Sequence, residues 1–308
     1  MTFEAYLNGD RPESVPDISW YDVYKVYSTC PAKWKFGEKK EQDSSKFADH
    51  VAMLNPESFT NRFMREPCAD DYEEILSTDA QIKDWLKSRG VSGYSAKKYD
   101  ELVAMVDMTS EKPFILKREQ QKVSDVAFSR GMDLIPASDW DRIASMRNVF
   151  FSNQAYSDML TDTYNDVLLV GDLCGVTLRL KYDAISKSGA IIDYVSAGSS
   201  NPEEFRNQAE RGGYYIKQAM LHDAFVSAYG KKPSEQIILC QEKSEPYIPT
   251  AFRITEQHLT IGRIQYQSAL AMLKVCMEKE TWVAYSSPGE MVDLPISPWL
   301  KKQYGIED

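Results

Sequence analysis

The segment from residue 175 to residue 196, GVTLRLKYDAISKSGAIIDYVS, predicts a β-hairpin. In its first half, apolar residues alternate with polar ones, which is typical of a strand with one buried face. The tripeptide Lys187-Ser188-Gly189 predicts a turn, and a second apolar run begins at Ala190. We therefore expect two neighbouring strands here, and the rest of the chain must fold around them.

Each arm of the hairpin carries one aspartate, Asp183 in the first and Asp193 in the second, and both lie toward the same end of the predicted sheet. Carboxylates on neighbouring strands can hold a divalent metal ion between them. The alternative is that both are turn or strand-end residues that face water. The remainder of the sequence is needed to choose between these interpretations.

Amphipathic helices and short apolar strands surround the hairpin. The segment 166–170 predicts a short buried strand led by Asp166, and a helix that starts at Pro202 is expected to run to about Tyr229. Two more strands are expected at Ile237–Cys240 and Thr250–Ile254, followed by a long helix. This order predicts an α/β (α+β) fold, in which helices flank a mixed central sheet and strand ends gather ligands.

Composition excludes several classes of protein. With 308 residues, 43% of them hydrophobic, the chain can form a large core, and its net charge of -10 excludes a uniformly basic coat for nucleic acid. Five scattered cysteines and three histidines do not form a zinc pattern and are typical of reduced thiols. No apolar run reaches the length of a membrane span, and the N-terminus does not resemble a signal peptide. We expect a soluble cytoplasmic protein without a membrane partner.

Residues 76–106 predict a compact helix–loop–helix unit with glycines in the loop. Its pattern resembles a SAP motif, a small DNA-binding module, and four cations could meet DNA phosphates: Lys87, Arg89, Lys97 and Lys98. The alternative is a helical hairpin that merely packs on the main domain. The chain is thus predicted to have a helical N-terminal part (1–75), this insertion (76–106) and a core domain (107–308).

Several short segments occur in an order that resembles a known family. They are the histidine segment from Asp49 and His50 to Pro56-Glu57, Arg130-Gly131-Met132 with Trp140–Met146, the Asp183 strand, Ile191-Ile192-Asp193, the helix start at Asn201–Phe205, and Tyr215-x-x-Gln218. Together they resemble the RecE / exonuclease VIII nuclease domain, a phage and prophage branch of the PD-(D/E)xK superfamily related to lambda exonuclease. The resemblance covers most of the chain and implies a PD-(D/E)xK-like core and a bacterial host cell.

The resemblance also implies a site. His50, Asp166, Asp183 and Asp193 would surround Mg²⁺ or Mn²⁺, and Gln218 and Tyr215 would border it beside the catalytic Asp183 and Asp193. Such a metal polarises the scissile phosphate and lowers the pKa of an attacking water. The implied partners are linear duplex DNA or its ends, further copies of the chain around a channel, and a protein partner in recombination or phage–host conflict.

The sequence departs from this family at one position, since Val195 stands where the family has its catalytic lysine. Alternation along a strand puts position 195 on the face of Asp193, and the loss of one preorganised donor costs about 100- to 1000-fold in rate. Lys181 matches a position where the family already has an arginine, and Lys187 lies in the turn. Lys217 is turned roughly 100° from Gln218 on its helix, although its side chain is long and flexible.

These observations predict an exodeoxyribonuclease-like fold with a degenerate site, impaired in cleavage, which still binds a divalent metal weakly and acts by binding DNA or a protein partner. One alternative is an active Mg²⁺-dependent double-stranded DNA exonuclease that uses a displaced lysine. Another is a metal-free fold with an unrelated interaction role.

Overall fold

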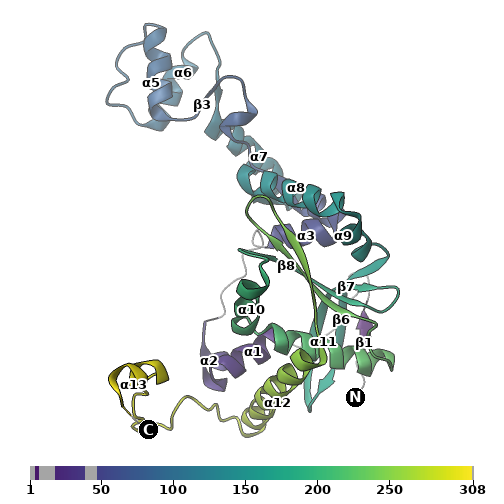
Figure 1. Ribbon diagram of the computed structural model, residues 1–308. Helices are drawn as coiled ribbons and strands as arrows, with labels where there is room; N and C mark the ends of the chain where they lie inside the picture. Colours follow the sequence, from purple (N-terminus) through teal and green to yellow (C-terminus); the bar gives the residue numbers. More distant parts are fainter. Residues whose placement is uncertain (1–3, 7–17, 39–46, 307–308) are drawn as a thin grey trace.

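The computed structural model describes residues 4–6, 18–38 and 47–306, and a six-stranded sheet lies at its centre (Figure 1). The strand order is β1-β6-β7-β8-β9-β10, and all neighbouring pairs are antiparallel except β8 and β9. The fold class predicted from the sequence is confirmed, because helices flank a mixed, mostly antiparallel sheet. The strand bounds are β1 Glu4–Tyr6, β6 Thr163–Leu173, β7 Val176–Ser186, β8 Ile191–Ala197, β9 Gln236–Glu242 and β10 Pro249–Arg253.

The predicted hairpin is formed by β7 and β8, and its strands separate soon after the turn. The turn contains Gly189 at φ 88°, a left-handed conformation that glycine adopts without steric cost. The two strands pair only through Ala184 with Ile192 and Ile185 with Ile191. Beyond these pairs β8 runs parallel to β9 along its whole length. The strands therefore diverge at the two hairpin aspartates.

Two helices, α10 (Pro202–Arg211) and α11 (Tyr214–Tyr229), connect β8 to the parallel strand β9. The expectation of one continuous helix is wrong, because the chain breaks at Gly212 and Gly213. Gly213 has a φ of 72°, and a Cβ atom there would lie 2.2 Å from the ring of Tyr24. The close approach of α1 (Trp20–Ser28) thus requires this glycine and gives α11 a new N-terminus.

Each face of the sheet is covered by helices. On one face α1, α11 and α12 (Glu256–Lys279) bury a core that includes Leu180, Tyr182 and Leu221. The helices α11 and α12 cross closely at Gly262, where an added Cβ would lie 2.0 Å from the carbonyl oxygen of Tyr215. On the other face α3 (Ala48–Leu54), α8 (Ala137–Ser152) and α9 (Gln154–Met159) pack around Phe150.

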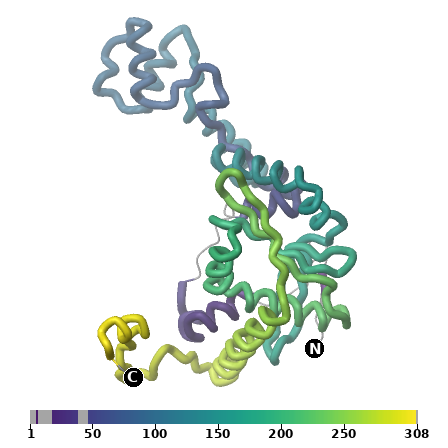
Figure 2. Tube along the Cα trace, viewed as in Figure 1, coloured from purple at the N-terminus to yellow at the C-terminus, as the bar shows by residue number. Residues whose placement is uncertain are grey.

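Residues 75–115 form a separate unit that we call the arm. It contains the strands β3 (Ile75–Leu76) and β4 (Phe114–Ile115), which pair in parallel, and the helices α5 (Asp79–Ser88) and α6 (Tyr99–Asp107). Its own small core consists of Ile82, Leu86, Leu102, Val106 and Ile115. In Figures 1 and 2 the arm lies at the far end of α7 (Leu116–Arg130), away from the central sheet.

The remaining elements are short. They are α2 (Pro31–Phe36), α4 (Pro56–Arg62), α13 (Pro298–Tyr304), the 3-10 helix η2 (Ala69–Asp71) and the parallel strands β2 (Phe63–Arg65) and β5 (Asp133–Ile135). The segment between α12 and α13 runs away from the sheet (Figure 1). None of the helices in the described part of the chain is both long enough and apolar enough to cross a membrane.

Candidate functional site

Asp183 and Asp193 meet where β7 and β8 diverge. Both are buried, with 6% and 2% of their surface exposed, and each carboxyl group affects the pKa of the other. The gap between the strands also frees the backbone N–H of Tyr194, which donates to Oδ2 of Asp183 at 2.9 Å. The hairpin therefore holds two carboxylates together inside the protein instead of at its surface.

Lys217 of α11 reaches this pair. Its Nζ lies 2.5 Å from Oδ1 of Asp193, and its side chain is only 13% exposed. The other carboxylate oxygen, Oδ2, accepts a hydrogen bond from Nε2 of Gln218 at 2.8 Å. Two adjacent helix residues thus bind the two oxygens of one carboxylate, although their side chains leave the helix in different directions.

The position of Lys217 follows from the break before α11. Lys217 and Gln218 leave α11 about 100° apart, and Tyr214, at spacings i, i+3 and i, i+4 from them, lies between these two directions. Because α11 starts at Tyr214, its first turns lie beside the diverging strands. The ammonium group also lies over the ring of Trp20, with Nζ 5.5 Å from the ring centre. The positive charge is therefore held between Asp193 and the face of an aromatic ring.

Gln218 is oriented by a buried chain of hydrogen bonds. Nε2 of Gln236 donates to Oε1 of Gln218 at 2.6 Å and to its backbone carbonyl at 2.8 Å. Since the oxygen of Gln218 is already used, its NH₂ group must face Asp193. His222 continues the chain, with Nδ1 3.3 Å from Oε1 of Gln236. This arrangement fixes the direction of the amide that binds Asp193.

His50 holds the other aspartate. Its Nε2 lies 3.0 Å from Oδ1 of Asp183, and its backbone N–H donates to Oδ1 of the neighbouring Asp49. Asp49 is itself buried, and its Oδ2 lies 3.1 Å from Nζ of Lys243. The helix α3 therefore brings a histidine and a carboxylate to the edge of the site.

Burial and mutual repulsion make the two carboxyl groups unequal. Burial raises the pKa of Asp193 to about 7. The charge of Lys217 acts to lower this pKa, and the charge of Asp183 acts to raise it further. Burial also acts to raise the pKa of Asp183, but the charges of Lys217 and His50 outweigh it, and that pKa is lowered. Burial acts to lower the pKa of Lys217, but Asp193 and Asp183 outweigh it and raise that pKa.

The pKa of His50 is also raised, because the charge and hydrogen bond of Asp183 outweigh the effect of burial. A buried pair of carboxylates that repel each other in this way is stabilised by a cation between them. Their oxygens are the ligand type that Mg²⁺ and Mn²⁺ prefer. The donor set of Asp183 and Asp193 therefore fits such an ion. Within residues 4–6, 18–38 and 47–306, no three His, Cys, Asp or Glu side chains are grouped closely enough to hold one.

The structure brings together four of the predicted site residues and separates two. His50, Asp183, Asp193 and Gln218 are linked by the contacts above. Asp166 stands opposite Asp183 in the β6–β7 register, but its φ of 54° interrupts the pairing and its carboxylate binds Nζ of Lys181 at 2.6 Å. Metal binding by Asp166 remains a prediction without a supporting contact.

Tyr215 does not lie on the side of α11 that faces the aspartates. Its ring packs on His258 of α12, with the ring centres 5.1 Å apart. A role for Tyr215 at the border of the site remains a prediction without a supporting contact. Val195 packs against an apolar cluster that contains Phe205 and Cys240. Lys217, which the sequence left as a weak candidate, is the residue that the structure adds to the site.

The four predicted DNA-binding cations lie on the surface of the arm. Arg89 pairs with Glu111 and stacks on Trp85 at 4.2 Å, and Lys97 pairs with Glu101. Lys87 and Lys98 are exposed. Their contact with DNA remains a prediction.

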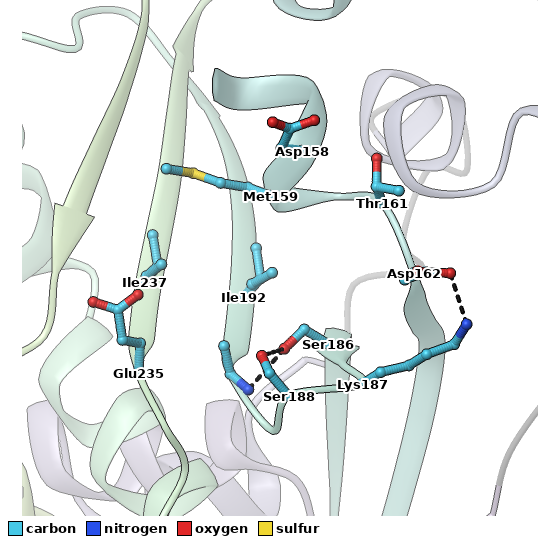
Figure 3. A pocket seen from close by; sticks show the side chains of 11 residues that line it. Asp158, Met159, Thr161, Asp162, Ser186, Lys187, Ser188, Ile192, Glu235 and Ile237 are labelled. Atoms are coloured by element: carbon cyan, nitrogen blue, oxygen red, sulfur yellow. Dashed lines mark hydrogen bonds and ion pairs between the residues drawn. The ribbon is translucent and has the colours of Figure 1, made fainter. Parts of the chain in front are cut away.

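A separate depression of about 370 Å³ lies near the turn of the hairpin (Figure 3). It is lined by residues from α9, the β7–β8 turn and β9, and neither Asp183 nor Asp193 is among them. Its most prominent polar contact is the ion pair between Lys187 and Asp162 at 2.7 Å, which neutralises both groups. The depression is therefore distinct from the carboxylate site.

A mixed sheet that carries two buried carboxylates and a lysine where its strands diverge defines a PD-(D/E)xK-like protein. The chain belongs to the family described as PDDEXK-like domain of unknown function (DUF3799), whose model matches residues 50–295. Membership in this family indicates a nuclease-type function.

A comparison with solved structures matches the crystal structure of a "putative exonuclease" from Eubacterium rectale, with a TM-score of 0.49 and 11% sequence identity over 91% of this chain and 90% of that chain. No curated protein matches the sequence.

Proposed function

We propose that the chain is a RecE-like, divalent-metal-dependent nuclease that degrades linear double-stranded DNA, with Lys217 in place of the lysine missing at Val195. The observation that supports this is the distance of 2.5 Å between Nζ of Lys217 and Oδ1 of Asp193 inside the protein. A lysine in the PD-(D/E)xK arrangement must place its ammonium beside the metal-binding carboxylates. A lysine from another element can take the role of the strand lysine if its ammonium group reaches the same place.

The residues of the site have separable roles in this proposal. Asp183 and Asp193 would hold Mg²⁺ or Mn²⁺, which when bound polarises the scissile phosphate and acidifies an attacking water. Lys217 offers a buried positive charge to the negative charge that develops on the phosphate. Gln218 keeps the Asp193 carboxylate in a fixed orientation, and His50 does the same for Asp183.

The alternative is a protein that binds DNA or a protein partner without cleaving it. Val195 supports this alternative, because its apolar packing leaves no cation on that strand. The RecE resemblance also suggests that copies of the chain associate around DNA, and the mass of the assembly in solution tests that part separately.

Degradation of end-labelled linear duplex DNA in Mg²⁺ or Mn²⁺, with closed circular DNA as a comparison, tests the proposal. We expect the parent chain to degrade the linear substrate and Lys217→Met to lower the rate by about 100- to 1000-fold. Lys181→Met is the matched control, because this lysine also binds an aspartate but lies outside the carboxylate pair. A parent chain that degrades no DNA in either metal would favour the binding-only alternative, and full activity of Lys217→Met would exclude the role of Lys217.

A further inference from the structure

An aromatic surface extends over α1 and α2. Tyr21 and Tyr27 of α1 are 55% and 42% exposed, and Phe36 of α2 is 74% exposed. Phe36 contacts Trp282, which follows α12, and Trp34 packs on the same ring at 5.6 Å. A depression of about 470 Å³ lies between these two tryptophans, with Lys35, Met277 and Glu280 on its walls. Phe36 is therefore presented to solvent beside an open pocket, and Tyr21 and Tyr27 expose their rings on α1.

Positive charge accompanies these rings. Lys25 lies on α1, and Lys33 and Lys35 lie on α2, where Nζ of Lys35 stands 5.0 Å from the ring centre of Trp282. In the described part of the chain, none of these three lysines is paired with a carboxylate. The nearby acids are Asp22, which accepts hydrogen bonds from Ser19 and Trp34, and the exposed Glu38 and Glu280. With three lysines and three acids this surface is close to neutral, whereas the whole chain has a net charge of -10.

A series of contacts links the aromatic surface to Lys217 of the candidate site. Nζ of Lys217 lies 5.5 Å from the ring of Trp20, the first residue of α1. The ring of Trp20 lies 5.7 Å from that of Tyr21, and Tyr21 lies 6.1 Å from Tyr24. Nε1 of Trp34 donates to Asp22 in the first turn of α1, which ties the α2 pocket to the same region. Aromatic rings therefore lie between Lys217 and the exposed part of α1.

A second apolar surface of the chain has a different chemistry. The outer side of α12 exposes Ile261, Ile264, Met272 and Val275, which are aliphatic or flexible side chains at helical spacing. Such a stripe suits another helix. Flat rings beside lysines suit nucleobases and phosphates, because every base has a π-face and every nucleotide carries a negative charge. The composition of the α1–α2 surface thus favours a nucleic-acid strand over a protein.

We propose that the α1–α2 surface, from Tyr21 to the pocket between Trp34 and Trp282, binds single-stranded DNA by base stacking. This inference rests on the proposed function, since a nuclease that degrades one strand of a duplex leaves the other strand single. The bases of that strand stack on Tyr21, Tyr27 and Phe36, while Lys33 and Lys35 contact its phosphates.

Fluorescence anisotropy with a 5′-labelled dT20 oligonucleotide tests the inference on the full-length chain in EDTA, where no cleavage is required. Phe36→Ser and the double variant Tyr21→Ser/Tyr27→Ser are each expected to raise the Kd for dT20 about ten-fold. Phe128→Ser is the matched control, because Phe128 of α7 is 89% exposed and lies outside this surface. We expect the control to bind dT20 like the parent, and the thermal midpoints of all variants to be unchanged.

Three results would overturn the inference. They are a parent chain that does not bind dT20, stacking variants that bind like the parent, and a Phe128→Ser control that loses as much affinity as Phe36→Ser. A change in assembly mass in Phe36→Ser with unchanged dT20 affinity would assign the surface to contacts between copies instead. Normal dT20 binding through Phe36 without any DNA degradation would contradict only the proposed function, whereas normal degradation with unaffected variants would contradict only this inference.

Discussion

Nζ of Lys217 and Oδ1 of Asp193 lie 2.5 Å apart, although the two residues are 24 positions apart in the sequence and come from a helix and a strand. The contact places an ammonium group beside a pair of buried carboxylates, although no lysine is present on strand β8. Helix α11 can supply the charge because it begins at the glycine break and passes across the point where β7 and β8 separate. The first prediction follows from this relationship.

A lysine on strand β8 should be able to take over the role of Lys217 on helix α11. In a Lys217→Met background, Val195→Lys is expected to restore part of the lost nuclease activity, because position 195 lies on the strand face of Asp193. The measurement is the initial rate on linear duplex DNA in Mg²⁺. A large gain in rate from Val195→Lys in the otherwise unchanged chain would mean that Lys217 does not supply the missing charge.

Metal binding should depend on the hairpin aspartates and not on Asp166. Asp193→Asn is expected to lower the affinity for Mn²⁺ by at least about ten-fold in isothermal titration calorimetry, because it removes a charged oxygen ligand. Asp166→Asn is expected to leave the affinity close to that of the parent, because its carboxylate binds Lys181. A larger loss of Mn²⁺ affinity in Asp166→Asn than in Asp193→Asn would show that Asp166 is a metal ligand.

The crossing of α11 and α12 should tolerate no side chain at position 262. Gly262→Ala places a Cβ 2.0 Å from a backbone oxygen, which forces the helices apart. We expect a loss of about 1 to 3 kcal/mol in the free energy of unfolding, visible as a lower thermal midpoint. Gly198→Ala is the control, since a Cβ there would meet no atom within 4 Å. Equal midpoints for the two variants would show that the helices can shift without cost.

The arm should contribute to DNA affinity through simple charge attraction. Lys87→Gln/Lys98→Gln is expected to weaken binding to duplex DNA and to reduce the slope of log K against log salt by about 2. The matched control is Lys231→Gln/Lys232→Gln, which removes the same charge from an exposed turn after α11. Identical salt slopes for the parent and the arm variant would leave the arm without a role in binding.

His222 should make stability depend on pH. Burial lowers its pKa below the ordinary value of 6.5, so the unfolded chain binds a proton there more readily than the folded chain. The stability that this neutral histidine contributes is present above about pH 6.5 and is lost as the pH falls below it. We expect the thermal midpoint of His222→Gln to fall less, or rise more, than that of the parent between pH 7.5 and 5.5. The raised pKa values of Asp193 and His50 act in the opposite direction in both proteins. A variant with the same pH dependence as the parent would contradict this.

The sequence predicts the hairpin, the flanking helices and the two aspartates because these depend on local patterns. Alternation identifies β7, and Gly189 identifies the turn. The same patterns cannot predict Lys217, because the side of α11 that faces the site depends on how the helix packs. They also cannot predict the left-handed backbone at Asp166, which turns its carboxylate toward Lys181. Contacts between distant segments decide both.

The parallel pairing of β3 with β4 allows the arm to be removed or replaced. Ile75 pairs with Phe114 and Leu76 pairs with Ile115, so the two ends of the segment between the strands lie close together. Paired strands lie about 4.8 Å apart, a gap that one or two residues can span. The arm can therefore be deleted or replaced by another module through a junction of one or two residues. The path of the chain through the central sheet stays the same.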